Sequence, residues 1–243
     1  MIGARVSRGR LPHEIFPYLR HLVQHGDQLA FIFAGTHKIE ELIGDYWSVL
    51  FNLAMYKKVE FLSREETIRL ITEPVQPYGM LYDDLAISEI LRLTACHPYF
   101  TQLLCNILVN RCNESQCNYV TVQNVRDALE ELLETGRAHL TFLWQTSDWE
   151  VRLTLAALAE LRDKMDRVTT AAIVDRLSAY QMHLDPGQIT KAMEQLVARG
   201  VARDIPGGPV SYDFTAQLYA HWLRRYRSLS KIVEEVSSEL VTE

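Results

Sequence analysis

The chain has 243 residues, of which 48% are hydrophobic and 23% are charged, and its formal net charge is −6 at pH 7. Such a chain is long enough for about two compact domains, and its composition excludes a linker-rich or disordered protein. The negative net charge argues against a protein whose main task is coating nucleic acid. No apolar run has the length of a membrane span, and residues 1–11 lack the apolar core of a signal peptide. We therefore expect a cytoplasmic protein with no membrane partner.

The first 62 residues alternate between helical and extended patterns. Apolar residues recur at helical spacing over 12–25, and a second, broken helical pattern covers 39–54. Residues 29–34 form a short apolar run between turn residues, which is typical of a strand buried on both faces of a parallel sheet. Residues 59–62 predict another short strand. Two parallel strands cannot form a stable sheet alone, so we expect residues 1–62 to be a truncated α/β domain.

The pattern becomes purely helical from Ser63 to residue 147. Ser63 and Glu66 form a capping box that opens a helix. Thr121 is expected to cap the last helix of this segment, after a short extended pair at 119–120. The segment is therefore predicted to be a small helical bundle. Its helices are expected at 63–73, 83–95, 99–112 and 122–133.

A different plan begins near residue 148. Two β-prone runs flank a Pro/Gly turn at 206–209, which predicts a hairpin after a set of helices. Helix, helix, helix and hairpin is the order of a winged-helix domain, here expected over 148–229. Residues 230–243 carry several glutamates and only one base, so we expect a solvated acidic tail. The predicted elements are helices at 149–161, 170–177, 186–199 and 216–227, with strands at 201–205 and 210–214.

No residue pattern indicates a metal site or a catalytic group. Cys96, Cys105, Cys112 and Cys117 fall in one short region, but their spacing matches no paired CxxC metal pattern. Cys105 and Cys112 lie in an apolar helical run, where a free cysteine behaves as a small hydrophobe. No Ser/His/Asp, Cys/His or paired-carboxylate arrangement is recognisable from spacing. We expect no metal, no catalytic residue and no enzymatic activity of the chain by itself.

Four short motifs occur in an order that resembles one family. Residues 31–37 (FIFAGTH) resemble a sensor-1 strand, which ends in a polar residue facing the nucleotide. Residues 61–66 (FLSREE) resemble the entry to a helical lid, and 94–99 (TACHPY) resemble the lid motif Gly-x-Pro. Residues 212–214 (YDF), followed by 218–223, resemble the end of an attached winged helix. In this order the chain resembles bacterial STAND and archaeal-type AAA+ ATPases related to the origin-binding initiators.

The resemblance implies a mainly α fold, with a remnant of the P-loop ATPase core over 1–62, a lid over 63–147 and the winged helix. No G-x-x-x-x-G-K-[ST] loop occurs, and no apolar strand ends in paired acids. In the family those parts precede the sensor strand, so the chain is expected to begin after them. ATP or ADP is then expected only in an intact parent protein or with a complementing chain. The missing ATPase core or another protein would be the partner.

The resemblance also implies contacts to the phosphates. Thr36 would be a sensor of the γ-phosphate or of water, assisted by His37. The alternative is that Thr36 caps the following helix and His37 is an exposed loop residue. Lys57 and Lys58 are candidate phosphate contacts, although a lysine pair before a strand is commonly a solvated edge.

His97 and Pro98 are implied to contact the nucleotide base at the lid. Pro98 is explained almost equally well as the first residue of a helix, and His97 as its cap. The lid glycine is replaced by Cys96, which puts the close approach of the backbone to the base in doubt. Three tryptophans, at positions 144, 149 and 222, recur with leucines on amphipathic helices, which favours packing in the core or between domains over stacking on a ligand.

The helix predicted over 186–199 is the part that would contact DNA. Helices that read the major groove present more arginine and less acid, whereas Glu194 lies on this helix. Basic and acidic residues are nearly balanced over 149–229, so contact with a protein or within the chain is the preferred interpretation. The candidate contacts to DNA or a partner are Gln188, Lys191, Gln195 and Arg199.

Three functions follow from these patterns. The first is the nucleotide-sensing lid and winged-helix portion of a signalling or regulatory AAA+/STAND ATPase, which does not hydrolyse ATP by itself. The second is a stand-alone winged-helix DNA-binding regulator. The third is a protein-interaction scaffold that uses no nucleotide.

Overall fold

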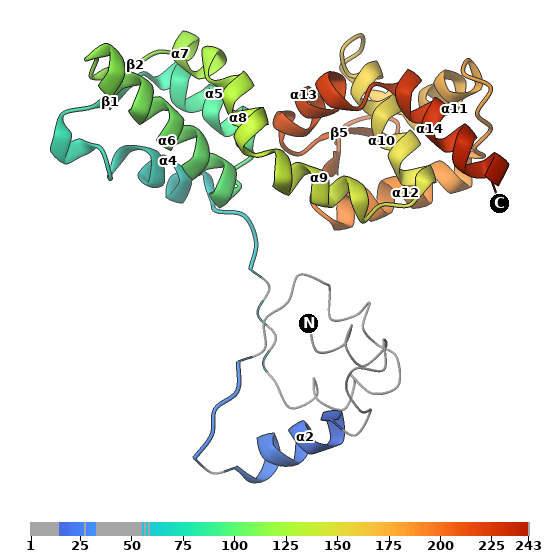
Figure 1. The fold of residues 1–243 in the computed structure, drawn as a ribbon, viewed down its shortest axis with the longest axis horizontal. Helices are drawn as coiled ribbons and strands as arrows, with labels where there is room; N and C mark the ends of the chain where they lie inside the picture. The colour runs from blue at the N-terminus through green and yellow to red at the C-terminus, as the bar shows by residue number, and fades with distance from the viewer. Residues whose placement is uncertain (1–14, 27, 33–54, 56, 58, 243) are drawn as a thin grey trace. The chain divides into compact units, whose positions relative to one another are not determined.

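A computed structural model describes residues 15–26, 28–32, 55, 57 and 59–242. The chain divides into two compact units, residues 1–60 and 61–243. The described residues are mainly helical with small sheets, which confirms the predicted mainly α class (Figure 1). No helix in these ranges combines the length and the apolar character needed to cross a membrane.

In the first unit, helix α2 (Ile15–His25) confirms the predicted helix, but the predicted strands are wrong where they are described. Residues 29–32 carry no strand, and the side chain of Ile32 is 96% exposed. Residues 59–62, at the junction of the two units, carry none either. A strand needs a hydrogen-bonded neighbour, and no described strand pairs with either run. Residues 33–54, with the rest of the first strand and the second helix, lie outside the described residues.

The second unit begins with a helical bundle, as predicted. Ser63 caps its first helix with the predicted capping box, in which Glu66 Oε2 accepts from the Ser63 backbone N–H at 2.8 Å. The predicted helix over 122–133 is broken at Ala128, and a further helix over 137–145 was not predicted. The helices are α4 (Arg64–Thr72), the 3-10 turn η2 (Gln76–Tyr78), α5 (Asp84–Thr94), α6 (Pro98–Ser115), α7 (Val122–Asp127), α8 (Leu129–Thr135) and α9 (Arg137–Gln145).

A two-stranded parallel sheet lies at one end of this bundle. Its strands are β1 (Leu81–Tyr82) and β2 (Tyr119–Val120), with Tyr82 opposite Val120. The extended pair at 119–120 was predicted, whereas β1 was not. Val120 is fully buried, so the short sheet closes the bundle core around Ile90, Leu104 and Leu132.

The rest of the unit, which we call the hairpin subdomain, surrounds one buried helix. This helix, α10 (Trp149–Leu161), is apolar on nearly all sides and packs against α11, α12, α13 and α14. The strands β3, β4 and β5 form an antiparallel sheet in the order β3-β5-β4. The elements are β3 (Val168–Thr169), α11 (Thr170–Ser178), α12 (Pro186–Ala198), β4 (Ala202–Asp204), β5 (Ser211–Phe214), α13 (Gln217–Tyr226) and α14 (Leu229–Thr242).

The acidic segment 230–243 is more than the expected solvated tail. It forms most of α14, whose Leu229, Ile232 and Val236 are buried against the core. These residues recur at i, i+3 and i+7, a helical stripe that the high glutamate content obscured. The glutamates Glu234 and Glu235 are exposed, as the charge pattern requires.

Helix α13 joins the bundle to the hairpin subdomain. It packs against α5 and α8 of the bundle and against α10 and β5 of the subdomain (Figure 1). Its Trp222 ring lies 6.2 Å from that of Trp144 at the end of the bundle, and both side chains are buried. The expected packing role of these tryptophans is therefore confirmed. The segments predicted as 63–147 and 148–229 form one packed unit.

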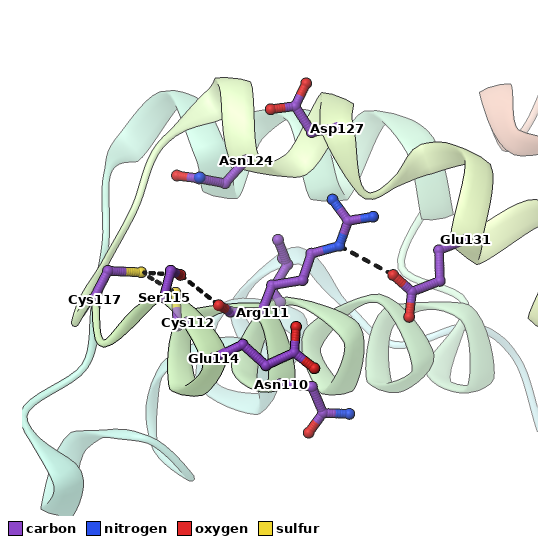
Figure 2. A pocket seen from close by; sticks show the side chains of 10 residues that line it. Asn110, Arg111, Cys112, Glu114, Ser115, Cys117, Asn124, Asp127 and Glu131 are labelled. Atoms are coloured by element: carbon purple, nitrogen blue, oxygen red, sulfur yellow. Dashed lines mark hydrogen bonds and ion pairs between the residues drawn. The ribbon is translucent and has the colours of Figure 1, made fainter.

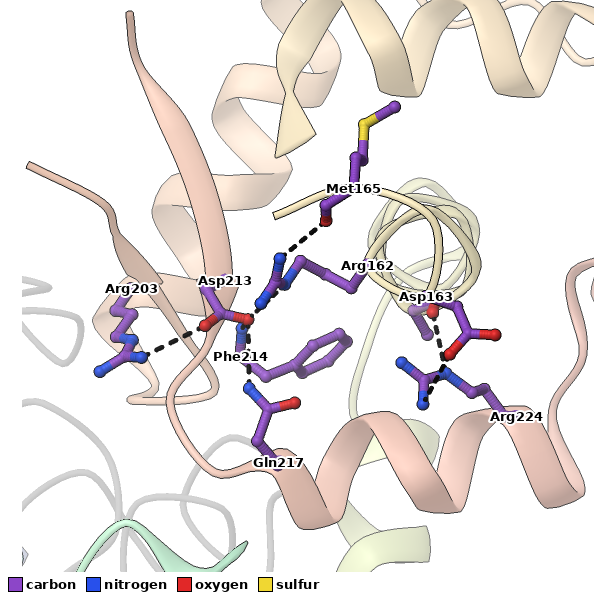
Figure 3. Close-up of polar contacts among 9 residues, drawn as sticks. Arg162, Asp163, Met165, Arg203, Asp213, Phe214, Gln217 and Arg224 are labelled. Atoms are coloured by element: carbon purple, nitrogen blue, oxygen red, sulfur yellow. Dashed lines mark hydrogen bonds and ion pairs between the residues drawn. The ribbon is translucent and has the colours of Figure 1, made fainter. Parts of the chain in front are cut away.

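A buried carboxylate holds the hairpin to the helices around it. Asp213 on β5 accepts hydrogen bonds from Arg162 Nε at 2.7 Å, Arg203 Nη2 at 3.2 Å and Gln217 Nε2 at 3.2 Å (Figure 3). The backbone N–H of Phe214 donates to the same carboxylate at 2.8 Å. Burial opposes ionisation of Asp213, but these bonds and the charge of Arg162 outweigh it and lower its pKa below 3.8. Asp213 is therefore ionised at neutral pH.

We expect Asp213→Ala to lower the free energy of unfolding by about 3 kcal/mol at pH 7, because it leaves Arg162 without its buried partner. Urea unfolding followed by circular dichroism measures this loss. Since the pKa of Asp213 is lowered in the folded state, its contribution is present above pH 3.8 and is lost as the pH falls below that value. The difference in free energy of unfolding between the wild type and the variant should therefore decrease as the pH falls below 3.8.

Asp204→Ala is the matched control, because Asp204 is an exposed carboxylate on the neighbouring strand. It should change the free energy of unfolding by no more than about 0.5 kcal/mol. Equal effects of the two substitutions would show that the buried network does not hold the hairpin.

Candidate functional site

The turn between α5 and α6 has an unusual backbone. Ala95 and Cys96 both adopt left-handed conformations, with φ of 48° and 62°, and neither is glycine. The His97 N–H donates to Thr94 O at 3.0 Å, and Pro98 then begins α6. A left-handed non-glycine residue costs about 1 kcal/mol or more, and such strain is concentrated at functional sites. The packing around the turn therefore keeps Ala95 and Cys96 in this strained conformation.

Aromatic rings gather over this turn. The His97 ring lies 4.8 Å from Phe61, 4.8 Å from Phe100 and 5.4 Å from His139, measured between centroids. Tyr99 stacks on His139 at 5.1 Å with an interplanar angle of 23°. We call Phe61, His97, Tyr99, Phe100 and His139 the turn cluster. Its rings come from three segments: the chain before α4, the start of α6 and the start of α9.

A glycine allows the start of α9 to reach the cluster. Gly136 lies between α8 and α9, and a Cβ atom there would stand 3.3 Å from the Phe100 ring and 2.9 Å from Leu132 O. The absence of a side chain thus lets the α8–α9 junction approach Phe100 closely. His139 is one turn further on and so enters the cluster.

His97 is held neutral. Burial, and then the neighbouring His139, lower the pKa of His97 from 6.5 to about 4. The Nδ1 atom of His97 is buried and has no hydrogen-bond partner. A neutral imidazole has one donor and one acceptor nitrogen, and a buried polar atom without a partner costs about 1–3 kcal/mol.

The cluster has open aromatic faces as well as a buried centre. Phe100 is fully buried, whereas the side chains of Tyr99 and Phe61 are 42% and 38% exposed. Flat exposed rings beside a neutral, under-bonded imidazole suit a planar heteroaromatic ligand with hydrogen-bonding edges.

Of the two predicted lid residues, His97 belongs to the turn cluster and Pro98 lies beside it in the chain, whereas no predicted phosphate contact joins the cluster among the described residues. His97 caps α6 without a side-chain hydrogen bond, and Pro98 is its first residue, as the alternative interpretation held. Thr36, His37 and Lys58 lie outside the described residues, and Lys57 is exposed in the first unit. Within the described part of the chain, no three His, Cys, Asp or Glu side chains are grouped to hold a metal ion.

Two of the four predicted contacts on α12 are used within the chain. The Gln188 side chain accepts from the Asp185 backbone N–H at 3.0 Å in a capping box. Arg199 donates to Ser147 Oγ at 3.1 Å and to Thr146 O at 3.3 Å. The bonds of Arg199 fasten the end of α12 to the segment between α9 and α10, which agrees with the intramolecular interpretation.

The other two contacts on α12 are Lys191, which is exposed, and Gln195, which is half-buried. Glu194 is exposed on the same helix. Its acidic charge offsets that of Lys191, so this face of α12 offers little attraction to a phosphate backbone.

Four members of the turn cluster were not predicted as site residues. Tyr99 and Phe100 follow the predicted pair directly, so their position beside Pro98 was a usable signal. Phe61 lies in the predicted lid entry but carries no polar group that marks a site. His139 lies in α9, a helix that was not predicted, and only the folded chain brings it to His97.

Comparisons with known proteins assign no relative to the chain. No protein-family model matches the sequence, and no curated protein matches it. The function proposed for the chain therefore rests on the turn cluster and on the order of the helices and strands.

We expect His97 to titrate near pH 4, which NMR of the imidazole protons measures directly. Because the pKa is lower in the folded state than in the unfolded state, the unfolded chain binds more protons between pH 4 and 6.5. The contribution of His97 to stability is therefore full above pH 6.5 and falls as the pH decreases towards 4. His97→Phe should remove this part of the pH dependence.

His183→Phe is the matched control, because His183 is exposed in the turn before α12. It should leave the titration of His97 as in the wild type. A resonance of His97 that titrates near 6.5 would contradict the buried, neutral state of this ring.

Proposed function

We propose that residues 61–242 are the nucleotide-sensing lid and winged-helix portion of a regulatory AAA+/STAND-type ATPase. The turn cluster carries the proposal: it combines a neutral, under-bonded His97 with exposed aromatic faces at the turn that resembles the Gly-x-Pro lid motif. In this role the chain contributes contacts to the base of ATP or ADP. It does not hydrolyse ATP by itself, because the sequence contains no phosphate-binding loop.

The chemistry of the cluster favours a purine. A purine is flat, so it can stack on Tyr99 or Phe61, and its edge carries both donors and acceptors for the neutral His97. A cationic imidazole would offer only donors. Because the pKa of His97 is low, its ring stays neutral at pH 7 and has one nitrogen that can accept a hydrogen bond. The exocyclic amino group of adenine is a suitable donor for such a bond.

Cys96 stands where the lid motif of the family has glycine, and its backbone conformation is one that glycine adopts readily. Cys96 adopts a φ of 62°, which glycine tolerates without strain. The turn geometry expected of the motif is thus compatible with the cysteine. The added side chain is half-buried and stands at the edge of the turn.

The order of elements in the hairpin subdomain supports a winged helix. The helices α10, α11 and α12 precede the hairpin of β4 and β5, and β3 between α10 and α11 completes the three-stranded sheet. This is the order expected for the domain over 148–229. The internal bonds of Gln188 and Arg199 favour a protein or intramolecular contact over DNA.

A physical connection links the turn cluster to the winged helix. The Phe100 ring contacts His97 at 4.8 Å and Tyr219 on α13 at 6.1 Å. A base that changes the position of His97 therefore acts on a buried ring that also touches α13. This contact offers a route by which nucleotide state could be converted into a rearrangement of the domains.

NMR titration of the full chain with adenosine and with ATP tests the proposal. Without a phosphate loop both should bind with about the same, roughly millimolar dissociation constant, as expected for contacts to a single small ring system. Shifts should centre on Tyr99, Phe100 and His139. His97→Ala should weaken binding by about tenfold, the loss of one buried hydrogen bond.

His183→Ala is the control and should bind as the wild type does. Cytidine tests the preference for a purine and should bind more weakly than adenosine. Micromolar binding of ATP would reveal a phosphate site that the proposal denies, and an absence of shifts at the turn cluster with every purine would refute the base contact.

Electrophoretic mobility shift over a salt series discriminates the DNA-binding alternative. The full chain should show only weak binding that is insensitive to DNA sequence and disappears at physiological salt. Tight, sequence-selective binding that Lys191→Ala weakens would favour a DNA-binding regulator instead.

A further inference from the structure

The end of helix α6 brings two cysteines together. The Sγ atoms of Cys112 and Cys117 lie 2.7 Å apart and are hydrogen-bonded, with Cys117 as the donor when both are thiols (Figure 2). Cys112 is buried in the last turns of α6, and Cys117 is exposed just beyond the helix. The turn cluster does not include either residue, so their role is separate from the proposed nucleotide contact.

The helix cap explains why these two side chains meet. Gln116 is left-handed with a φ of 52°, its N–H donates to Asn113 O at 3.4 Å, and the Cys117 N–H donates to Cys112 O at 2.9 Å. This pair of bonds is the Schellman motif, in which the residues that correspond to Cys112 and Cys117 pack their side chains together. An apolar pair usually occupies these positions, and here both are cysteines.

We propose that Cys112 and Cys117 form a reversible thiol-modification site that reacts with small-molecule disulfides and closes into an intramolecular disulfide. A disulfide bond is about 2.0 Å long, so the two sulfurs need to approach each other by less than about 1 Å to form it. The bond would fasten Cys117, two residues before β2, to the last turn of α6.

The surroundings divide the two cysteines into an attacking and a resolving thiol. Hydrogen bonds from Cys112 and Ser115 lower the pKa of Cys117, whereas burial raises the pKa of Cys112. The Ser115 hydroxyl donates to Arg111 O at 2.5 Å, and its oxygen lies 3.7 Å from Cys117 Sγ. Cys117 is therefore the exposed thiol that ionises more readily, and Cys112 is the protected thiol beside it.

A groove at the end of α6 gives a small disulfide access to this pair. It has a volume of about 600 Å³, and both cysteines line it together with Arg111 and Asn124 (Figure 2). The guanidinium of Arg111 pairs with Glu131 at 3.0 Å and stands at the rim of the same groove. The acidic residues Glu114, Asp127 and Glu131 line the same groove, so its net charge is negative and a small disulfide reaches the cysteines without electrostatic attraction.

The reaction proceeds by two exchanges. The Cys117 thiolate attacks one sulfur of the small disulfide, forms a mixed disulfide and releases one thiolate, which takes up the proton that Cys117 lost. The Cys112 sulfur then attacks Cys117 Sγ and loses its proton to the second departing thiolate. The two cysteines are oxidised to one disulfide, and the small disulfide is reduced to two thiols.

Mass spectrometry of the folded full chain tests the proposal. The reduced chain is incubated with oxidised glutathione at neutral pH, alkylated and digested. The wild type should lose two hydrogen atoms between Cys112 and Cys117 and retain no glutathione. The Cys112→Ala variant should keep glutathione on Cys117, because no second thiol displaces it. The Cys117→Ser variant should form neither the mixed disulfide with glutathione nor the intramolecular disulfide.

Cys105→Ser is the matched control, because Cys105 lies on the same helix and burial raises its pKa to about 12. It should react as the wild type does. Urea-unfolded chain serves as a second control and should lose the preference for this pair. The proposal is overturned if folded wild-type chain stays reduced, if Cys96 reacts as fast as Cys117, or if glutathione remains on Cys117 without closure to Cys112.

Discussion

Burial of helix α13 between the bundle and the hairpin subdomain is the interaction on which the unit of residues 61–242 depends. Trp222 and Leu218 are buried on one short helix, which packs against α5, α8 and α10. Aromatic side chains bury large apolar areas, so this helix contributes strongly to the free energy of both halves. The ion pair of Arg225 with Glu130 at 2.6 Å adds a polar contact across the same boundary. Neither half would keep its core covered without α13.

Local signals in the sequence predicted most helices, and non-local contacts account for the errors. The caps at Ser63 and Thr121 were found because a helix cap is a local signal, and at Ser63 the capping box needs only residues three apart. Strand β1 was missed because its two residues are extended only through pairing with β2, far along the chain. The apolar run predicted as a strand at 29–34 carries none over its described residues 29–32, because periodicity cannot distinguish a buried strand from other apolar segments. In the turn cluster, His97 was found from a motif, whereas His139 reaches it only through tertiary packing.

Both proposed sites are built at helix ends where non-glycine residues are left-handed. Ala95 and Cys96 reverse the chain after α5 and bring His97 under aromatic rings, and Gln116 reverses it after α6 and brings two thiols together. In each case strain in the backbone is retained because buried neighbours hold the turn. The turns fix the positions of reactive or under-bonded groups that the helices alone would leave apart. Purine binding and thiol exchange thus remain separate proposals with a common structural origin.

Native-state hydrogen exchange of the full chain across a urea series tests the central claim that α13 makes residues 61–242 one cooperative unit. The slowest amides of α6 in the bundle and of α10 in the hairpin subdomain are compared, since these helices lie at the two cores. The account predicts equal free energies of opening that fall in parallel with urea concentration. Opening of α10 at lower urea than α6, with a smaller dependence on urea, would contradict it, because the two halves would then unfold independently.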